Sequence, residues 1–285
     1  MMKTIDTLVA DIEEVVKGKG GWDGTITHFL SESISDMAKT RFSKPQEPRG
    51  YLSLSSIGTP CQRKLWYKIN TPGDAEPLQA SALLKFFFGD IIEALILSLA
   101  MAAGHRVTGM QTRMDVHGIK GSRDAVIDGV TVDVKSASSY SFKKFKDGNL
   151  RNDDPFGYIS QLSSYVYAGK EDTLVEEKTK GAFLVVDKAL GHICLDIHNF
   201  EYDMVGKEQE MLNAKAMVTG PIPEERIPPV PQSKTSPNTK LSTTCSYCEF
   251  KKSCYPEVRT FIYETGPLFL VDVKTEPRVA EALNG

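Results

Sequence analysis

The tetrapeptide VDVK occurs twice in this chain, as Val132–Lys135 and as Val271–Lys274. In a strand, the aspartate and the lysine of this motif point to the same face, because side chains alternate with a period of two. A carboxylate can bind a divalent cation, and a neighbouring ammonium can stabilise developing negative charge. Each copy is therefore a candidate half of a metal-dependent hydrolytic site.

The first copy lies in a predicted β-hairpin. Asp128-Gly129, flanked by β-branched residues, favours a two-residue turn. With these residues as the turn, Asp124 faces Asp133 with Cβ atoms roughly 5 Å apart, and Lys135 shares their face. Like charges in this position are destabilising, so we predict a divalent cation between the two aspartates. The alternative is a solvent-exposed hairpin with scattered charges.

The second copy has no such partner. The residue nine positions before Asp272 is Tyr263, and Gly266-Pro267 is expected to break the chain between them. We therefore interpret Asp272 and Lys274 as solvated charges on a terminal strand.

Glu93 is the third candidate acid. It lies in the most apolar predicted helix, residues 79–103, where a carboxylate is costly unless it is paired or bound to a metal. Asp90 is three residues away and can lie near the same face, and Gly89 permits the close approach of another backbone segment. The alternative is that Glu93 points to water.

The cysteines suggest a second metal centre. Cys245, Cys248 and Cys254 form a C-x2-C-x5-C cluster, and Cys61 lies far upstream. In a cytosolic protein this pattern indicates metal binding rather than disulfides. Four thiolates can hold Zn²⁺ or a [4Fe–4S] cluster, and the spacing does not choose between them. Cys194, alternating with apolar residues, is expected to be a small core residue.

Composition sets broader limits. The 285 residues are 41% hydrophobic and 25% charged, with a net charge of −3, which argues against a protein coated in basic residues but permits a local basic groove. The N-terminus lacks the apolar region of a secretory signal, and the uncharged run at residues 94–104 is shorter than the roughly 20 residues of a membrane span. We expect a cytoplasmic protein without membrane contacts.

The chain divides into three expected regions. Residues 1–50 form an N-terminal region of two amphipathic helices, joined at glycines 18–21 and ending in the polar segment 43–50. Residues 51–220 mix strands with helices near 79–103, 155–168 and 202–217. Residues 221–285 form an extended strap with the cysteine cluster and a terminal strand. The predicted fold class is α/β, with a mixed central sheet flanked by helices.

These motifs together resemble the PD-(D/E)XK nuclease superfamily, closest to its RecB-type and lambda-type exonuclease branches. The residues that carry the resemblance are Gly89-x-x-x-Glu93, Asp124, Asp133-x-Lys135 and Gln161-x-x-x-Tyr165. The resemblance implies a restriction-endonuclease-like core, in which one helix supplies the first acid and a hairpin supplies the others. It also implies that Gln161 and Tyr165 support the site and meet DNA.

The same resemblance implies Mg²⁺ or Mn²⁺ held by Glu93, Asp124, Asp133 and the intervening Val134. Two positions depart from the family pattern. Arg123 stands where the family name has proline, and Glu93 stands where RecB-type members often carry histidine. The second departure favours the lambda-like arrangement and leaves the number of metal ions open.

The cysteine layout is similar to that of iron–sulfur nucleases of the RecB/AddB type and of CRISPR adaptation, with one cysteine before the core and three after it. It implies a [4Fe–4S] cluster on Cys61, Cys245, Cys248 and Cys254, with Zn²⁺ as the alternative. The cluster would staple the C-terminal strap to the N-terminal side of the core, and a redox role is left open.

Two basic segments are candidates for DNA contact. Lys143, Lys144 and Lys146 alternate with Phe142 and Phe145, a pattern that suits a single-strand groove and equally suits a solvated amphipathic turn. Arg63 and Lys64, which follow Cys61, are within reach of phosphates in the expected arrangement.

The expected function is a metal-dependent DNA exonuclease of phage or bacterial recombination and repair, stabilised by the cluster. The alternatives are a DNA end-processing endonuclease of the CRISPR-adaptation type and a non-catalytic DNA-binding module of the same fold. The resemblance also suggests a single-strand annealing protein as a partner. No G-x-x-x-x-G-K-[ST] motif is present, which excludes a fused P-loop helicase. Strand polarity and oligomeric state are left open.

Overall fold

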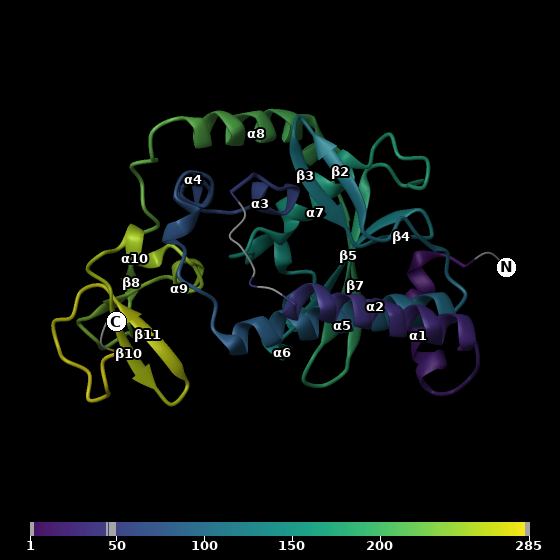
Figure 1. The fold of residues 1–285 in the computed structure, drawn as a ribbon, viewed down its shortest axis with the longest axis horizontal. Coiled ribbons are helices and arrows are strands. Elements are labelled where there is room, and N and C mark those ends of the chain that lie inside the picture. The colour runs from purple at the N-terminus through teal and green to yellow at the C-terminus, as the bar shows by residue number, and fades with distance from the viewer. Residues whose placement is uncertain (1–2, 44, 46–49, 283–285) are drawn as a thin grey trace. The chain divides into compact units, whose positions relative to one another are not determined.

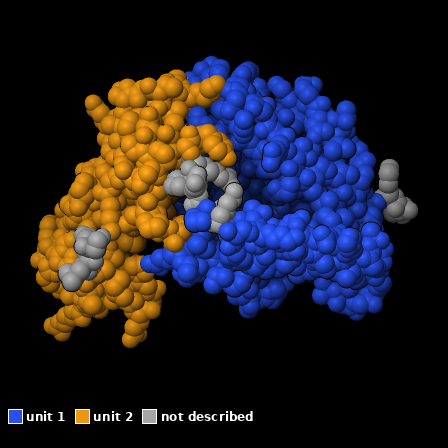
Figure 2. Space-filling view, viewed as in Figure 1, with its two compact units in different colours: residues 1–47, 52–58, 79–213 blue, residues 48–51, 59–78, 214–285 orange. Residues whose placement is uncertain are grey.

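The structure is a computed structural model that describes residues 3–43, 45 and 50–282. Its contacts divide the chain into two compact units (Figure 2). Unit 1 comprises residues 1–47, 52–58 and 79–213, and unit 2 comprises 48–51, 59–78 and 214–285. These units differ from the three expected regions, because residues 59–78 group with the C-terminal part of the chain. Of the polar segment expected at 43–50, residues 44 and 46–49 lie outside the described residues.

Unit 1 contains the long helices and most of the strands (Figure 1). Its elements are η1 (Ile5–Thr7), α1 (Leu8–Val16), α2 (Gly24–Phe42), α3 (Leu54–Ile57), α5 (Ala80–Ala102), β1 (Val107–Thr108), β2 (Thr112–Val116), β3 (Ile119–Arg123), β4 (Ala125–Ile127), β5 (Val130–Ala137), α6 (Ser139–Lys146), η3 (Leu150–Asn152), α7 (Tyr158–Ala168), β6 (Lys180–Asp187) and β7 (Ile193–Asn199). Helix α8 (Glu201–Thr219) begins in unit 1 and ends in unit 2.

The central sheet has the order β1-β4-β5-β6-β7. Only the β5–β6 pair is parallel, and α6 and α7 form the crossover between these two strands. The predicted α/β class with a mixed central sheet is therefore confirmed. Strands β2 and β3 form a separate antiparallel ribbon.

Helices cover both faces of this sheet. On one face, Leu8 and Ile12 of α1 and Leu97 of α5 pack in one core cluster with Val132 and Val134 of β5. On the other face, a second cluster joins residues of α6, α7, β6 and the loop that follows β7, namely Phe142, Phe145, Leu162, Val166, Phe183, Val185 and Phe200. Strand β5 is thus buried between two layers of helices, which explains its nearly continuous burial.

The expectation of two amphipathic N-terminal helices holds for only one of them. Helix α1 buries Leu8 and Ile12, whereas α2 has no fully buried side chain. The reason is that α2 packs on α5, with Phe42 edge-on against Phe87 and Arg41 paired with Asp90. A helix in this outer position needs no wide apolar face.

Unit 2 combines short helices with a small antiparallel sheet. Its elements are α4 (Gln62–Asn70), η2 (Pro72–Asp74), β8 (Val230–Pro231), β9 (Thr239–Lys240), α9 (Thr243–Ser246), α10 (Lys251–Cys254), β10 (Arg259–Tyr263) and β11 (Gly266–Leu270). The sheet has the order β10-β11-β9-β8. Residues 59–78 belong here because Tyr67 stacks on Phe250 and the Glu76 N–H donates to the Glu249 carbonyl.

The second VDVK copy is not a strand, contrary to the sequence-based expectation. Strand β11 ends at Leu270, and the backbone bends from Val271 onward. Gly266-Pro267 does not break the chain, because it opens β11, which pairs with β10 in a hairpin. The Asp272 carboxylate has a partner within unit 2, since Thr239 Oγ1 donates to Asp272 Oδ2 over 2.7 Å.

Within the described ranges, no helix has the length and apolar character of a membrane span.

Candidate active site and cysteine cavity

The β4–β5 hairpin has the predicted turn and register. Asp128 and Gly129 have φ values of 49° and 81°, as a type I′ turn requires. Ile127 pairs with Val130 and Ala125 with Val132. Because Val132 and Val134 are buried in the cluster under α5, the alternating Asp133 and Lys135 point to the opposite face of the sheet.

Asp133 and Lys135 form a buried ion pair on that face. The Lys135 Nζ lies 2.6 Å from Asp133 Oδ2, and the two side chains are 18% and 3% exposed. Apart from this ion pair, Oδ2 has no hydrogen-bond partner among the described residues. Gln161 of α7 joins the two groups: its Nε2 donates to Asp133 Oδ1 over 3.3 Å, and Lys135 donates to its Oε1 over 3.5 Å.

Asp124 reaches this site from the start of the hairpin. The paired ladder stops at Ala125 and Val132, so Asp124 is not a strand partner of Asp133. Instead, Asp124 Oδ2 accepts a hydrogen bond from the Val134 N–H over 2.7 Å. The carboxylate thus crosses over to β5, and the two aspartates still interact through their charges.

Glu93 comes to the same site from α5. Its Oε1 accepts a hydrogen bond of 2.5 Å from Gln111 Nε2. Burial raises the pKa of Glu93 to about 7, and the charges of Asp133 and Asp90 add to this effect, whereas Gln111 opposes it. Gly89 does not serve the predicted close approach, because no described atom lies within 4 Å of a Cβ placed there.

The charges of the site are strongly interdependent. Burial, followed by the charges of Asp133 and Glu93, raises the pKa of Asp124 well above its ordinary value. Burial alone would lower the pKa of Lys135, but Asp133 outweighs it and raises that pKa above its ordinary range. Lys135 is therefore a permanent cation facing three crowded carboxylates, the kind of arrangement that clusters at functional sites.

Helix α7 supplies three further groups. Gln161 makes the contacts described above, and Tyr165 is buried, with its pKa raised by burial and by Asp133. Tyr158 was not identified from the sequence: its ring centroid lies 4.8 Å from Lys135 Nζ, a cation–π contact. Its position one turn before Gln161 is the sequence signal that could have identified it.

The aromatic part of the DNA-binding hypothesis is wrong. Phe142 and Phe145 are only 5% and 3% exposed, because they belong to the core cluster under α6. Their spacing reflects an amphipathic helix rather than a stacking surface for bases. Lys143 and Lys146 are exposed, and Lys144 pairs with Asp153 over 2.6 Å.

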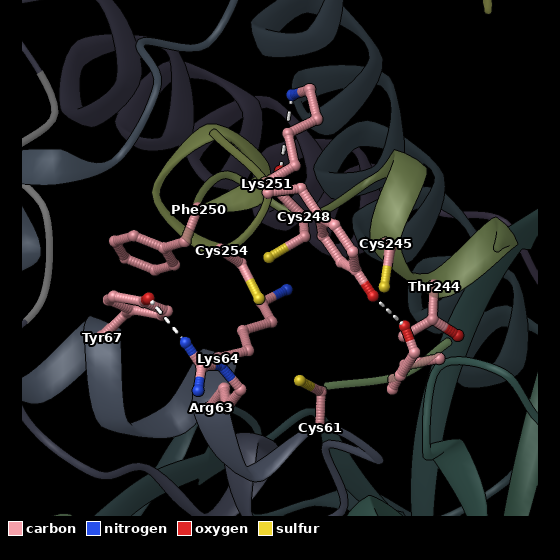
Figure 3. A pocket seen from close by; sticks show the side chains of 12 residues that line it. Cys61, Arg63, Lys64, Tyr67, Thr244, Cys245, Cys248, Phe250, Lys251 and Cys254 are labelled. Atoms are coloured by element: carbon pink, nitrogen blue, oxygen red, sulfur yellow. Dashed lines mark hydrogen bonds between the residues drawn. The ribbon is translucent and has the colours of Figure 1, made fainter. Parts of the chain in front are cut away.

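The four predicted cysteine ligands line one cavity of unit 2. Figure 3 shows the sulfur atoms of Cys61, Cys245, Cys248 and Cys254 directed into the same space. The empty volume is about 380 Å³, part of it open to solvent. Burial raises the pKa of Cys245, and it raises that of Cys248 to about 12. All five cysteines are free thiols, and Cys194 packs on the core cluster that includes Phe183, as expected.

Arg63 and Lys64 lie at this cavity rather than on an open surface. Arg63 donates to the Pro223 carbonyl and to the Tyr67 hydroxyl, and Lys64 pairs with Glu249 over 3.1 Å. Both groups that were expected to reach phosphates are therefore engaged in contacts within unit 2.

Among the described residues, no three His, Cys, Asp or Glu side chains are arranged to hold a metal ion.

Comparisons with known proteins add little to this geometry. A scan against protein-family models gives no match, and a search of curated proteins gives none either. The crystal structure of SSO0001 is similar over 80% of this chain and 96% of its own, with 16% sequence identity and a TM-score of 0.40. Similarity at this level carries no argument about function.

Proposed function

We propose that this protein is a metal-dependent deoxyribonuclease, acting as an exonuclease at DNA ends. The observation that carries the proposal is the convergence of Glu93, Asp124 and Asp133 around the buried Lys135, with the raised pKa of Glu93 as its electrostatic signature. A restriction-endonuclease-like core, with its acids on a helix and a hairpin, accounts for this arrangement.

The chemical type of these donors suits Mg²⁺ or Mn²⁺, although no three side chains of the described residues are arranged to hold an ion in this structure. Hard divalent cations prefer carboxylate oxygens, and a cation would offset the burial and the mutual repulsion that together raise the pKa of Asp124 and Glu93. Glu93, Asp124, Asp133 and the Val134 carbonyl would hold the ion. When bound, it would supply a Lewis acid for the scissile phosphate and a more acidic water.

The chain itself supplies the remaining parts. Lys135 contacts Asp133, Gln161 and the ring of Tyr158. These contacts set the position of its ammonium group before a substrate binds. Such a preorganised cation stabilises a developing oxyanion or orients a nucleophilic water. Gln161 bridges Asp133 and Lys135 and keeps the two groups in register. Lys143, Lys144 and Lys146, on the helix after β5, are the candidates for phosphate contact.

For the cysteine cavity we propose a [4Fe–4S] cluster with a structural role. Cys61 and the three cysteines of the C-terminal cluster line one cavity, and Arg63, Lys64 and Lys251 line it as well. These cations would offset the negative charge of four thiolates and a cluster. Zn²⁺ is the alternative, and metal analysis separates the two.

The decisive experiment uses the purified protein and end-labelled DNA. Duplexes, single strands and closed circles are incubated with Mg²⁺, Mn²⁺ or EDTA. An exonuclease releases nucleotides from linear DNA only with metal and spares the circles. Cleavage of circles, or cuts at a fixed distance from an end, would favour the end-processing endonuclease. Metal-independent binding without cleavage would favour the non-catalytic module. Addition of a single-strand annealing protein tests the proposed partner.

A further inference from the structure

Gln111 has a backbone conformation that its residue type disfavours. Its φ is 48°, in the left-handed region that glycine and asparagine adopt most readily. Among the described non-glycine residues, Gln111 shares this region with His117 and Asp128. Asp128 belongs to the hairpin turn, and His117 to the β2–β3 turn. Gln111 lies in the loop before β2, next to the candidate active site.

Three hydrogen bonds hold Gln111 in this conformation. Its N–H donates to the Asp124 carbonyl over 3.1 Å, and its own carbonyl accepts from Ser122 Oγ over 3.0 Å. Its side chain Nε2 donates to Glu93 Oε1 over 2.5 Å. Gln111 therefore connects two of the three acids, which come from different elements: Asp124 precedes β4, and Glu93 lies on α5.

We propose that Gln111 is a positioning residue that holds the Glu93 carboxylate in place for the divalent cation. The proposal rests on the proposed function. In this backbone conformation the side-chain amide of Gln111 reaches Glu93 of α5, while its backbone N–H stays bonded to the Asp124 carbonyl. Outlying backbone conformations persist where the surroundings determine them, and they cluster at sites that need a fixed geometry. Changing a residue that orients a metal ligand typically lowers metal affinity or activity by roughly 10–100-fold.

The choice of glutamine is informative. Glycine or asparagine would relieve the backbone strain at φ 48°. Glycine lacks the amide, and asparagine is one methylene shorter, so neither keeps the bond to Glu93. Glutamine thus provides a hydrogen bond to Glu93 that glycine and asparagine, the residues best suited to this backbone conformation, do not provide. A purely structural turn would gain from either substitution and lose nothing at the site.

The test compares Gln111→Gly and Gln111→Asn with the parent in two measurements. The first is the melting temperature in EDTA, which we expect to be equal to or above that of the parent. The second is Mn²⁺ affinity by calorimetry or electron paramagnetic resonance, which we expect to fall roughly tenfold. We also expect kcat to fall while KM for DNA changes little, because the positioned group acts on the metal.

His117→Gly is the matched control. His117 has a φ of 53°, lies in the β2–β3 turn and pairs with Glu208 of α8. This variant should leave Mn²⁺ affinity unchanged. Unaltered affinity in both Gln111 variants, with a parent that binds Mn²⁺, overturns the inference and leaves the proposed function standing. A fall in melting temperature that accounts for the lost affinity also overturns it. A parent that binds no divalent cation contradicts the metal site itself.

Discussion

The Asp124 carboxylate accepts the backbone N–H of Val134, with 2.7 Å between Oδ2 and the nitrogen. This bond connects the start of the hairpin to the residue between Asp133 and Lys135. The β4–β5 backbone pairing ends at Ala125 and Val132, so the Val134 N–H has no partner on β4 and donates to Asp124 instead. Asp124 is therefore both part of the strand architecture and one of three crowded acids.

Asp124→Asn should separate these two roles. The Asn carbonyl oxygen can still accept the Val134 N–H, and the buried charge disappears. We expect a melting temperature in EDTA equal to or above that of the parent, because the pKa of Asp124 is raised and its ionised form is disfavoured. The variant should lose most of the stabilisation that Mg²⁺ or Mn²⁺ gives, along with cleavage. Brief chelator exposure protects the proposed cluster.

Asp272→Asn, in the second VDVK copy, is the control and should melt and respond to metal like the parent. If Asp124→Asn is clearly less stable in EDTA and still gains fully from metal, Asp124 does not hold the cation.

The raised pKa of Glu93 predicts how stability depends on pH. A carboxyl whose folded pKa is about 7, against an ordinary value of 4.5, stabilises the fold most at low pH. That contribution, roughly 3 kcal/mol at most, is lost as pH rises toward and through 7. In metal-free protein, the melting temperature should fall less between pH 5 and pH 8 in Glu93→Gln than in the parent.

Added Mg²⁺ should reverse this trend in the parent, because the cation binds the ionised carboxylate and its stabilisation grows as pH rises. The same pH dependence in the parent and in Glu93→Gln, with and without Mg²⁺, would show that Glu93 does not titrate in this window.

The two VDVK copies should differ in function. Asp133→Ala and Lys135→Ala should each lower kcat at least about 100-fold, since the first removes a proposed metal ligand and the second removes the cation that would stabilise developing negative charge. Each also leaves the other buried charge unpaired, which costs roughly 3–5 kcal/mol of stability. Asp133→Asn and Lys135→Met are therefore measured beside them, with circular dichroism to verify the fold. Asp272→Ala and Lys274→Ala should cut nearly normally. Equal loss from both copies in folded proteins contradicts the assignment.

The cysteine cavity should contain iron and sulfide. We expect a brown protein with a broad absorbance at about 400 nm. Replacing any one of Cys61, Cys245, Cys248 and Cys254 by serine should remove the colour. Cys194→Ser should keep it, because Cys194 packs outside the cavity. Colourless protein with stoichiometric zinc after anaerobic purification would favour the Zn²⁺ alternative.

Local patterns were sufficient for much of the fold. The Asp128-Gly129 turn determines the register of β4 and β5, because a two-residue turn with positive φ at both positions allows only one pairing. The helical patterns near 79–103, 155–168 and 202–217 likewise predicted α5, α7 and α8 within a few residues. These features depend on neighbours in the chain, and a sequence displays such neighbours directly.

Other features depend on contacts between distant residues. No local pattern shows that Gln111 reaches Glu93, and the helical spacing of Tyr158 and Phe142 does not say which groups these side chains contact. The sequence specified which residues carry charge and which turns are possible, because both are local properties of the chain. The tertiary structure decided which charges meet and which side chains are buried, because both depend on how the helices pack against the sheet.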